Sequence, residues 1–499
     1  MTDHLLLGLQ VALSLNNLFF CLLGALLGTL VGVLPGLGPV ATIAVLLPVT
    51  FSLPPDSALI MLAGIFYGAQ YGGSTTAILL NLPGEVTSMV TALDGHQMAR
   101  QGRGGVALAT AALGSFVAGC IATSLIALCG PLLVAAAQSL QPADYFSLML
   151  AGLIVAVALA SGSIVSAVAM IILGLMLGLV GIDVNSGVRR MTLGIPELNE
   201  GLDFVAVIMG LFGITEILSN LAHISRPSGM TSPITSLMPT QKDFRRAWPA
   251  SLRGTFIGSI CGLLPGAGVT LGSFISYAVE KRVSRTPREF GHGAIEGVAG
   301  PESANNAAAQ TAFIPLLSLG IPGNPVMAVM AGAMMIHGIA PGPLLMDSHP
   351  TIFWGMVVSM WVGNLMLLVI NLPLVGLWVK LLSVPYRMLF PVIIIFCAVG
   401  AYTMTNSPFN IVVMLIFGLV GFALRCLNLE PAPLVLGFVL GPMMEENMRR
   451  ALLISRGDPL IFVERPISAF FLVCAVIMLI VFILPSMRGR REEMFAETD

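Results

Sequence analysis

Two stretches of the chain set small polar side chains into otherwise apolar surroundings, which is where binding chemistry is expected. The first, from Tyr67 to Glu85, reads YGAQYGGSTTAILLNLPGE, and the second, from Gly300 to Pro325, reads GPESANNAAAQTAFIPLLSLGIPGNP. Buried polar groups without partners are costly, so such side chains bind one another or a ligand. Hydroxyl and amide oxygens hold small cations, and free N–H groups at a helix end hold anions. The two stretches therefore predict a site for an organic anion and a small cation.

The elements that must position these side chains are transmembrane helices. Only 10% of the 499 residues are charged and 56% are hydrophobic, whereas about 25% of an ordinary soluble protein is charged. At about 20 apolar residues per spanning helix, the apolar tracts supply roughly ten to twelve crossings and leave no soluble domain. We predict an all-α integral membrane protein that lies in the lipid bilayer over almost its whole length.

Composition excludes several other classes of protein. The 23 Lys and Arg are dispersed over short loops, which leaves no basic face for nucleic acid. The seven cysteines stand singly in apolar tracts without a CxxC pair, so neither a disulfide framework nor a zinc site is predicted. The start, MTDHLLLGLQ, has Asp3 and no basic residue ahead of its apolar run. That pattern is unlike a cleaved secretory signal and predicts that the segment remains in the mature protein.

The longest polar interruption divides the chain near its middle. It runs from residue 226 to residue 253 and contains Lys242, Arg245 and Arg246. The positive-inside rule places this loop in the cytoplasm, together with the RGRR sequence at 488–491. We therefore predict a first transmembrane repeat over 1–222, a cytoplasmic linker over 223–253 and a second transmembrane repeat over 254–499.

The two halves resemble each other in sequence. GTLVGVLPGLG at 28–38 shares six identities in eleven with GSICGLLPGAG at 258–268, and the Pro-Gly of NLPGE recurs in GIPGN. The stretch from Ser163 to Gly174 also aligns with Ser407 to Gly418. The offsets grow from 230 to 239 to 244, as one duplicated unit with a few insertions would produce. An internal duplication is predicted, and many secondary transporters bind substrate between two such halves at mid-membrane.

The relative orientation of the halves depends on the placement of two arginine pairs. Arg189-Arg190 and Arg449-Arg450 occupy similar places in the two halves. If both pairs are cytoplasmic the halves are parallel, and if one pair is buried or periplasmic they can be inverted. We expect inverted repeats.

Pro-Gly sequences interrupt two of the apolar tracts at their centres. The tract from Arg253 to Lys281 is cut by LPGAG at 264–268, which leaves two arms too short to cross a bilayer core of about 30 Å. Either the arms form a re-entrant hairpin that enters from the cytoplasm, or they form one kinked span; the copy at 34–39 behaves likewise. Non-helical backbone at membrane depth is tolerated where protein or a wet cavity satisfies it, so these loops point to a cavity. The alternative is that the glycines serve only close helix packing.

The second polar stretch also suggests where its helix begins. Pro301 suits the first helical position and Glu302 suits the positive end of the helix dipole, which sets Asn305 and Asn306 one turn inside. Ionisable residues within the apolar tracts are functional candidates by default. Six of them stand near tract ends: Glu85, Asp94, Asp183, Glu216, Glu302 and Arg425.

From these patterns we predict two overlapping sets of site residues. The predicted substrate-binding residues are Gly36, Gly38, Gly73, Ser74, Thr75, Thr76, Asn81, Gly266, Gly268, Ser303, Asn305, Asn306 and Asn324. The predicted coupling-ion residues are Pro35, Gly36, Asn81, Pro265, Gly266 and Asn305, and the only metal expected is Na⁺. For each single residue the competing interpretation is that its polar group only joins helices together.

Four segments together resemble a known family. The run from Gly32 to Glu85, LDGHQMARQGRGG at 93–105, the second polar stretch, and APLVLGFVLGPMMEENMRRAL at 432–452 are similar to the large membrane subunit of the tripartite tricarboxylate transporters, the TctA family. The resemblance covers essentially the whole chain. It implies a bacterial inner-membrane permease that works with a small membrane subunit of about four helices and with a periplasmic solute-binding protein that delivers a carboxylate.

Uptake in such a family is driven by a Na⁺ or H⁺ gradient, and the absence of a GxxxxGK[ST] phosphate loop agrees with transport without ATP. We expect no cofactor and no enzymatic activity, and the sequence leaves open assembly as a homo-oligomer. Two other functions remain open: a membrane-embedded enzyme and a passive organic-anion channel. The sequence contains neither HExxH nor GxSxG, and its six histidines are scattered, which disfavours the enzyme.

Overall fold

A computed structural model describes the protein over residues 2–34, 38–81, 85–159, 163–183, 186–222, 237–264, 268–381, 391, 394–395, 397–402 and 406–483. In the first part of the chain the elements are α1 (Thr2–Ala12), α2 (Leu15–Val33), α3 (Pro39–Thr50), α4 (Pro55–Leu80), η1 (Val86–Ser88), α5 (Met89–Met98), η2 (Ala99–Arg103), α6 (Gly104–Ala137), α7 (Pro142–Leu159), α8 (Ile164–Gly178), β1 (Gly181–Ile182), β2 (Arg189–Arg190), η3 (Pro196–Glu200), α9 (Phe204–Ile208), η4 (Met209–Ile214) and α10 (Thr215–Ala222).

The remaining elements follow the central loop. They are α11 (Gln241–Gly262), α12 (Gly268–Val283), η5 (Pro287–Glu289), α13 (Glu296–Thr311), α14 (Phe313–Leu319), α15 (Pro325–Ile336), α16 (Leu345–Ser348), α17 (Pro350–Asn371), α18 (Val375–Leu381), α20 (Pro408–Cys426), α21 (Pro431–Ile454), α22 (Ile461–Glu464) and α23 (Pro466–Ile483). Helix α11 therefore begins inside the segment predicted as a linker and runs through residue 253 without a break.

The described residues are helical almost throughout, in agreement with the predicted all-α membrane class. Within them, four helical segments are long and apolar enough to cross a membrane: 15–33, 89–137, 350–371 and 408–426. Six shorter apolar helices accompany them. Large apolar side chains such as Leu132, Leu419 and Phe470 are more than 60% exposed on the outer faces of α6, α20 and α23. An exterior of this kind suits lipid rather than water.

Helices α2 and α4 pack with their backbones in direct contact. A Cβ atom added to Gly24, Gly28 or Gly32 would collide with a backbone carbonyl oxygen of α4. The three carbonyls belong to Met61, Ile65 and Ala69. Small residues at every fourth position let two helices approach this closely inside a membrane. The packing interpretation of the glycine spacing therefore holds for Gly28 and Gly32.

Helices α11 and α13 repeat this contact in the second half. Their three glycines, Gly254, Gly258 and Gly262, follow those of α2 by 230 positions. The carbonyls that they meet, those of Gly300, Ala304 and Ala308, follow those of α4 by 239 positions. The two pairs thus match residue for residue, at the same two offsets that align the halves in sequence.

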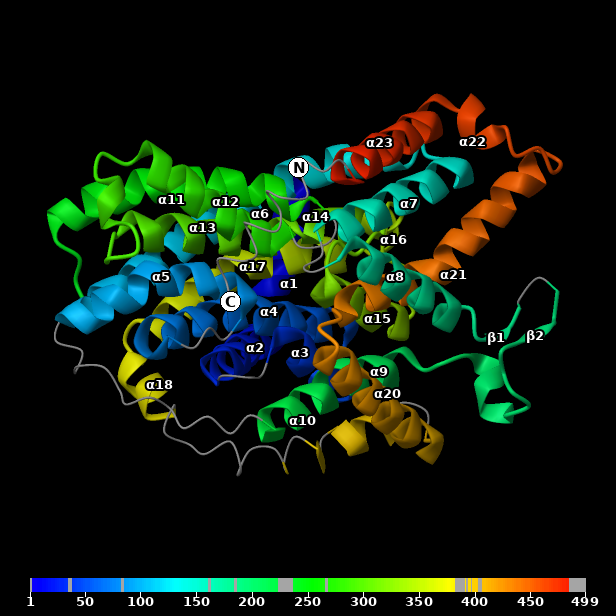
Figure 1. Ribbon diagram of the computed structural model, residues 1–499, viewed down its shortest axis with the longest axis horizontal. Coiled ribbons are helices and arrows are strands. Elements are labelled where there is room, and N and C mark those ends of the chain that lie inside the picture. Colours follow the sequence, from blue (N-terminus) through cyan, green and yellow to red (C-terminus); the bar gives the residue numbers. More distant parts are fainter. Residues whose placement is uncertain are drawn as a thin grey trace.

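Two further close pairs join the halves to each other. Gly174 and Gly178 of α8 lie against the carbonyls of Leu434 and Phe438 in α21. Gly210 of η4 lies against the carbonyl of Met414 in α20. In each pair one helix comes from the first half and the other from the second. Helices α8 and α21 and the short strands β1 and β2 lie at one end of the molecule, and α5, α11, α12 and α13 lie at the other end (Figure 1).

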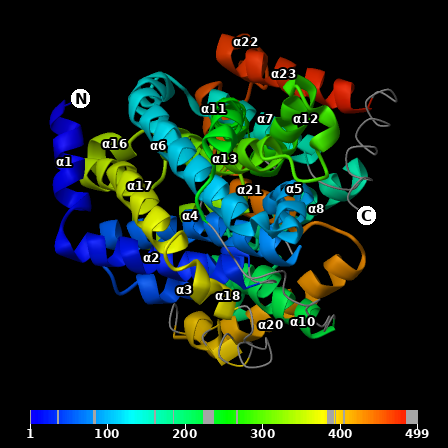
Figure 2. The same ribbon diagram turned by 90° about the vertical axis from the view of Figure 1, so that its left-hand side faces the viewer.

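Helices α4 and α13 cross in opposite directions. Ser74 near the C-terminal end of α4 contacts Glu302 near the N-terminal end of α13. Phe66, earlier in α4, lies with its ring centroid 6.2 Å from that of Phe313, just beyond α13, and the two rings are tilted by 52°. Helix α6 crosses the molecule beside both of them (Figure 2). The crossing brings the two polar stretches together at the middle of the molecule.

The predicted start of α13 at Pro301 was wrong, because the helix begins at Glu296 and Pro301 lies inside it. Arg246 of α11 fixes the true start: its guanidinium donates to Glu296 at 2.7 Å and to Glu289 at 2.6 Å. The hydrogen bond from Arg246 lowers the pKa of Glu289, so this carboxylate stays charged beside the helix start. Glu302 consequently sits two turns inside the helix and receives no help from its N-terminal N–H groups.

The close backbone packing predicts that a side chain at Gly258 destabilises the protein. In Gly258→Val the new Cβ would overlap Ala304, and overpacking of this kind typically costs about 1–3 kcal/mol. We expect a lower melting temperature for the purified protein in detergent. Gly376→Ala is the matched control because nothing lies within 4 Å of a Cβ placed there. Equal melting temperatures for Gly258→Val and the wild type would contradict the described packing.

Candidate functional site

The carboxyl group of Glu302 lies at the centre of a buried polar cluster. Its side chain is fully buried and is surrounded by the hydroxyl groups of Ser74, Thr91 and Ser115. Ser74 Oγ of α4 lies 2.7 Å from Oε2, and Thr91 Oγ1 of α5 lies 2.6 Å from Oε1. Glu302 therefore ties together α4, α5 and α13, which belong to different parts of the chain.

Asn306 of α13 connects the cluster to helix α6. The amide nitrogen of Asn306 donates to Ser115 Oγ of α6 at 2.7 Å and to the carbonyl oxygen of Glu302 at 3.1 Å. Both protons of the amide group are thus used. One turn further along, Thr123 of α6 lies 3.4 Å from the amide oxygen of Gln310. A row of polar contacts therefore fixes the rotation of α6 against α13.

A second carboxyl group, that of Glu85, lies at the edge of the same cluster. It follows the C-terminal end of α4, and the Glu85 and Glu302 carboxyl groups would repel each other if both were ionised. Thr87 Oγ1 lies 3.3 Å from the amide oxygen of Gln70 and 3.5 Å from Glu85 Oε2. Oε1 of Glu85 is buried without a hydrogen-bond partner. An unsatisfied buried oxygen of this kind calls for a ligand or a water molecule.

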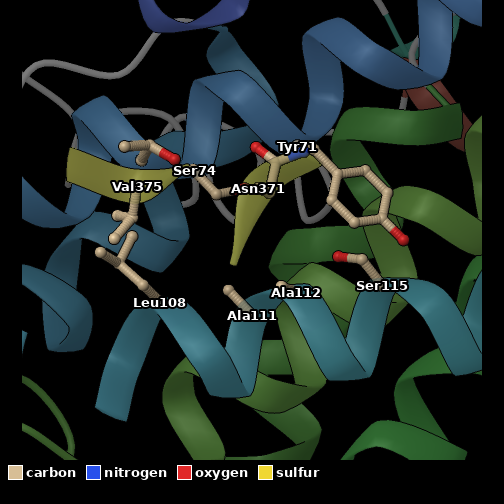
Figure 3. A pocket seen from close by; sticks show the side chains of 9 residues that line it. Tyr71, Ser74, Leu108, Ala111, Ala112, Ser115, Asn371 and Val375 are labelled. Atoms are coloured by element: carbon tan, nitrogen blue, oxygen red, sulfur yellow. The ribbon is translucent and has the colours of Figure 1, made fainter. Parts of the chain in front are cut away.

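A small cavity borders the cluster between α4, α6 and α17. Five of its lining residues are polar: Tyr71, Ser74, Thr75, Ser115 and Asn371. Figure 3 shows Tyr71, Ser74 and Asn371 on one side of the space and Leu108, Ala111, Ala112 and Ser115 of α6 beneath it. The hydroxyl group of Tyr71 and the amide oxygen of Asn371 are buried without a partner. Ser74 both lines the cavity and contacts Glu302, so one hydrogen bond separates the carboxyl group from the cavity.

The cavity is too small for an organic acid in this conformation. The cavity volume is about 10 Å³, which is room for about one water molecule. A ligand of several carbon atoms needs a larger volume, so the cavity is closed to such a ligand in this conformation.

Asp94 holds the start of α13 in place from α5. Its Oδ1 accepts hydrogen bonds from the backbone N–H groups of Gly291, Gly293 and Ala294, each at 2.8 Å. Its Oδ2 accepts a hydrogen bond from the hydroxyl group of Tyr277 at 2.9 Å. Charge-assisted bonds to several N–H groups are strong, and they make Asp94 a positioning residue for the helix that carries Glu302.

The structure brings four of the predicted site residues to the cluster or its cavity. Ser74 and Thr75 line the cavity, and Asn306 contacts Ser115 in its wall. A Cβ at Gly73 would lie 3.6 Å from Ser88 Oγ and 3.7 Å from the backbone nitrogen of Glu85. These polar side chains lie on continuous stretches of α4 and α13, and not on unwound backbone as the idea of a broken helix implied.

Six other predicted site residues lie elsewhere or make local contacts. Thr76 donates to the carbonyl of Gly73 in its own helix, and Asn324 caps the N-terminus of α15 by accepting from Met327 N–H. Asn81 is an exposed residue in the left-handed conformation at the C-terminal end of α4. The last three lie at helix starts or beside α6: Gly38 precedes α3, Gly268 opens α12 against Cys261, and Ser303 faces Gly114.

Asn305 and the Pro-Gly loops need separate mention. Both polar atoms of the Asn305 side chain are buried without a hydrogen-bond partner, although the residue does not line the cavity. Pro35, Gly36, Pro265 and Gly266 lie outside the described residues.

Sequence reasoning missed Ser115 and Asn371 as cavity residues. Both residues lie in long apolar helices, and an isolated polar residue in such a helix does not indicate a site by itself. Ser124, nine residues after Ser115 in α6, donates to the carbonyl of Cys120 in its own helix. The two serines differ in the direction that the rotation of α6 gives them, because Ser115 faces α13 and the cavity and Ser124 does not line the cavity. In the part of the chain that the structure describes, no group of three or more His, Cys, Asp or Glu is placed to hold a metal ion.

Comparison with known proteins gives one family and two relatives. The model of the tripartite tricarboxylate transporter TctA family matches residues 18–436. A relative from Agrobacterium vitis, described as an uncharacterized 52.8 kDa protein in the TAR-I ttuC′ 3′ region, is 54% identical over 497 residues, which are 100% of this chain and 99% of the relative. Another, in the TAR-II ttuC′ 3′ region, is 57% identical over 242 residues, 48% of this chain and 100% of the relative. No solved structure matches the chain.

The contacts of Asp94 predict a local loss of protection when its charge is removed. In Asp94→Asn the Gly291–Ala294 N–H groups lose an ionised acceptor, and hydrogen bonds to charged groups contribute about 1.5–3 kcal/mol each. We expect faster amide hydrogen exchange over residues 290–297, measured by mass spectrometry of the purified protein. Asp347→Asn in the α16 turn serves as the control and leaves this segment unchanged. Unaltered exchange in Asp94→Asn would show that the carboxylate does not hold the loop.

Proposed function

The chain belongs to the tripartite tricarboxylate transporter TctA family, and from this membership we propose that it moves tricarboxylates or related small organic acids across the bacterial inner membrane. A Na⁺ or H⁺ gradient drives the movement. A periplasmic solute-binding protein delivers the acid, and a small membrane subunit of about four helices completes the transporter. The chain itself is a transporter component and not an enzyme.

The observation that carries this proposal is the polar cavity in the apolar interior. Tyr71, Ser74, Thr75, Ser115 and Asn371 line it from three helices that surround it. Burial of so many polar groups is costly unless they serve a ligand, and an anion needs hydrogen-bond donors of this kind. Hydroxyl and amide groups can donate to carboxylate oxygens without the strong attachment that a lysine or arginine would give. Weak, multiple contacts suit a site that must also release its ligand.

We propose further that the two halves are inverted repeats and that transport occurs by alternating access around this cavity. The glycine contacts of α2 with α4 and of α11 with α13 support the duplication, because they match at fixed offsets. The opposite directions of α4 and α13 support the inversion. The hairpins formed by α2 with α3 and by α11 with α12 are proposed as re-entrant.

The arginine pairs do not argue against inversion. Arg190 and Arg449 both contact Glu445, at 2.8 Å and 2.6 Å, and Arg449 also contacts Asp183 at 3.1 Å. The two pairs therefore lie on the same side of the molecule. They are not equivalent positions, however, because Arg190 follows α8 whereas Arg449 belongs to α21, the helix that packs beside α8.

The proposed function is tested by reconstitution of the chain with both partner proteins into liposomes. Uptake of a panel of labelled carboxylates is measured under imposed Na⁺ or proton gradients, with and without the binding protein. Accumulation of at least one acid against its own gradient is expected. Flux that only equilibrates the acid, without need of the binding protein, would indicate a channel. Absence of any carboxylate movement with both partners present would refute the proposal.

The site itself is tested by removal of single polar groups. Ser74→Ala, Asn305→Ala and Asn306→Ala are expected to abolish uptake while the proteins still insert into the membrane, since each deletes a buried polar group of the two stretches. Membrane insertion is checked by fractionation and by size-exclusion profiles in detergent. Ser124→Ala and Asn447→Ala are matched controls, because these side chains bond only to carbonyls of their own helices. Wild-type uptake in all three site variants would rule out the proposed site.

A further inference from the structure

Glu302 differs from the other charged residues of the apolar tracts in the kind of partner it has. Of the six ionisable residues that the sequence places near the ends of apolar tracts, four have charged or backbone partners: Asp94, Asp183, Glu216 and Arg425. Asp183 pairs with Arg449, Glu216 pairs with Arg425, and Asp94 accepts three backbone N–H groups. Glu302 is fully buried, and no Lys, Arg or His nitrogen of the described residues lies within 4.0 Å of it. Its contacts are with the neutral hydroxyl groups of Ser74, Thr91 and Ser115.

The charged and titratable groups around Glu302 supply no cation for it. Helices α6 and α14, which pack against α13, carry no charged side chain. Arg253 of α11 is bound to Glu280 at 2.6 Å, and Arg246 is bound to Glu296. The titratable groups on the elements packed around Glu302 are Asp56, Tyr67 and Tyr71 on α4, Glu85 ahead of η1, Asp94 and His96 on α5, Cys120 and Cys129 on α6, Lys242, Asp243, Arg245, Arg246, Arg253 and Cys261 on α11, Tyr277, Glu280, Lys281 and Arg282 on α12 and Glu296 on α13 itself. An ionised carboxylate in this position would have no compensating charge.

The hydrogen-bond geometry around Ser74 requires one more proton than the serine can supply. Ser74 Oγ lies 3.1 Å from the carbonyl oxygen of Gln70 and 2.7 Å from Glu302 Oε2. A serine hydroxyl carries a single proton and a backbone carbonyl oxygen carries none. If Glu302 is ionised, only one of the two contacts can be a hydrogen bond. If Oε2 carries a proton, Glu302 donates to Ser74 while Ser74 donates to Gln70, and both contacts are satisfied.

We propose that Glu302 carries the proton that couples the proton gradient to carboxylate uptake, an inference that rests on the proposed transport function. In the closed state Glu302 is a neutral acid whose O–H group points to Ser74. The neutral form adds no negative charge beside the cavity, so an anionic substrate can occupy it. On opening to the cytoplasm, the O–H bond of Glu302 breaks, Ser74 Oγ accepts that proton and passes its own proton to a cavity water. One proton leaves, and the carboxylate that remains repels the substrate.

Glu302→Gln is the decisive variant because it imitates the neutral acid. The glutamine amide can donate to Ser74 and accept from Thr91, so both contacts of Glu302 are kept and the fold is expected to survive. The substituted side chain cannot release a proton. In reconstituted transporter, accumulation driven by an imposed proton gradient should fall by about tenfold or more, the size of a typical coupling effect. Exchange of labelled internal for unlabelled external carboxylate, which needs no net proton movement, should persist.

Two comparisons make the result specific to Glu302. Glu446→Gln removes an exposed carboxylate that is paired with Arg450 and should leave both accumulation and exchange unchanged. Glu302→Asp keeps a titratable group and should retain part of the proton-driven accumulation. Accumulation by Glu302→Gln with the proton-gradient dependence of the wild type would overturn the inference. So would wild-type accumulation that follows a Na⁺ gradient while no proton enters with the acid.

An infrared measurement tests the protonation of Glu302 without transport. In purified protein at neutral pH, the carbonyl band of a protonated carboxylic acid should be present in the wild type and reduced in Glu302→Gln, and it should shift in D₂O. Glu446→Gln should keep the full band. Identical bands in the wild type and Glu302→Gln would overturn the inference. If the wild type neither accumulates nor exchanges any carboxylate, the proposed function fails; if it exchanges a carboxylate but moves no proton, only the role of Glu302 fails.

Discussion

The contact of the Glu302 carboxyl group with the hydroxyls of Ser74 and Thr91 is the interaction on which the centre of the molecule depends. An interior made of apolar helices offers no water to a polar side chain, so each buried polar group must find its partner in another helix. Glu302 finds such partners in Ser74 and Thr91, and it thereby fixes where α4, α5 and α13 cross. The cavity beside Ser74 borders this crossing on the side of α6 and α17.

Close glycine packing supplies the frame around that centre. Gly28 and Gly258 allow the backbones of neighbouring helices to touch, which replaces the hydrophobic driving force that is missing between helices in lipid. Asp94 then sets the depth of α13 by holding the loop before it. Packing and hydrogen bonding therefore divide the work: glycines fix how close the helices come, and buried polar groups fix their register.

The sequence predicts the class, the family and part of the site. A low charge content is enough for the all-α membrane class, and the TctA resemblance that the motifs indicate is confirmed by the family match over residues 18–436. The two polar stretches do meet, at Ser74 and Glu302. The sequence did not predict which face of α6 turns toward the cavity or at which residue α13 begins. Ser115 and Ser124 look alike in the sequence, yet only Ser115 faces the cavity.

The start of α13 shows why local signals fail. Pro301 is a good first residue of a helix, but the ion pair of Arg246 with Glu296 and the contacts of Asp94 extend the helix ahead of it. Tertiary contacts of residues far apart in the chain outweigh a preference of one residue. Asn324 shows the reverse case, because a local contact, the hydrogen bond from Met327 N–H that caps α15, occupies its amide oxygen.

Backbone contact between helices also restricts how the molecule can change shape. Two helices without a layer of side chains between them have nothing to repack, so α2 with α4 and α11 with α13 must each travel as a single body. Deformation is then left to the joints where the helical hydrogen-bond pattern already changes. Gly102, at a φ of 77° in the π-helical turn between α5 and α6, is one such joint, and η4 between α9 and α10 is another. We therefore expect any change of shape to concentrate in these two turns.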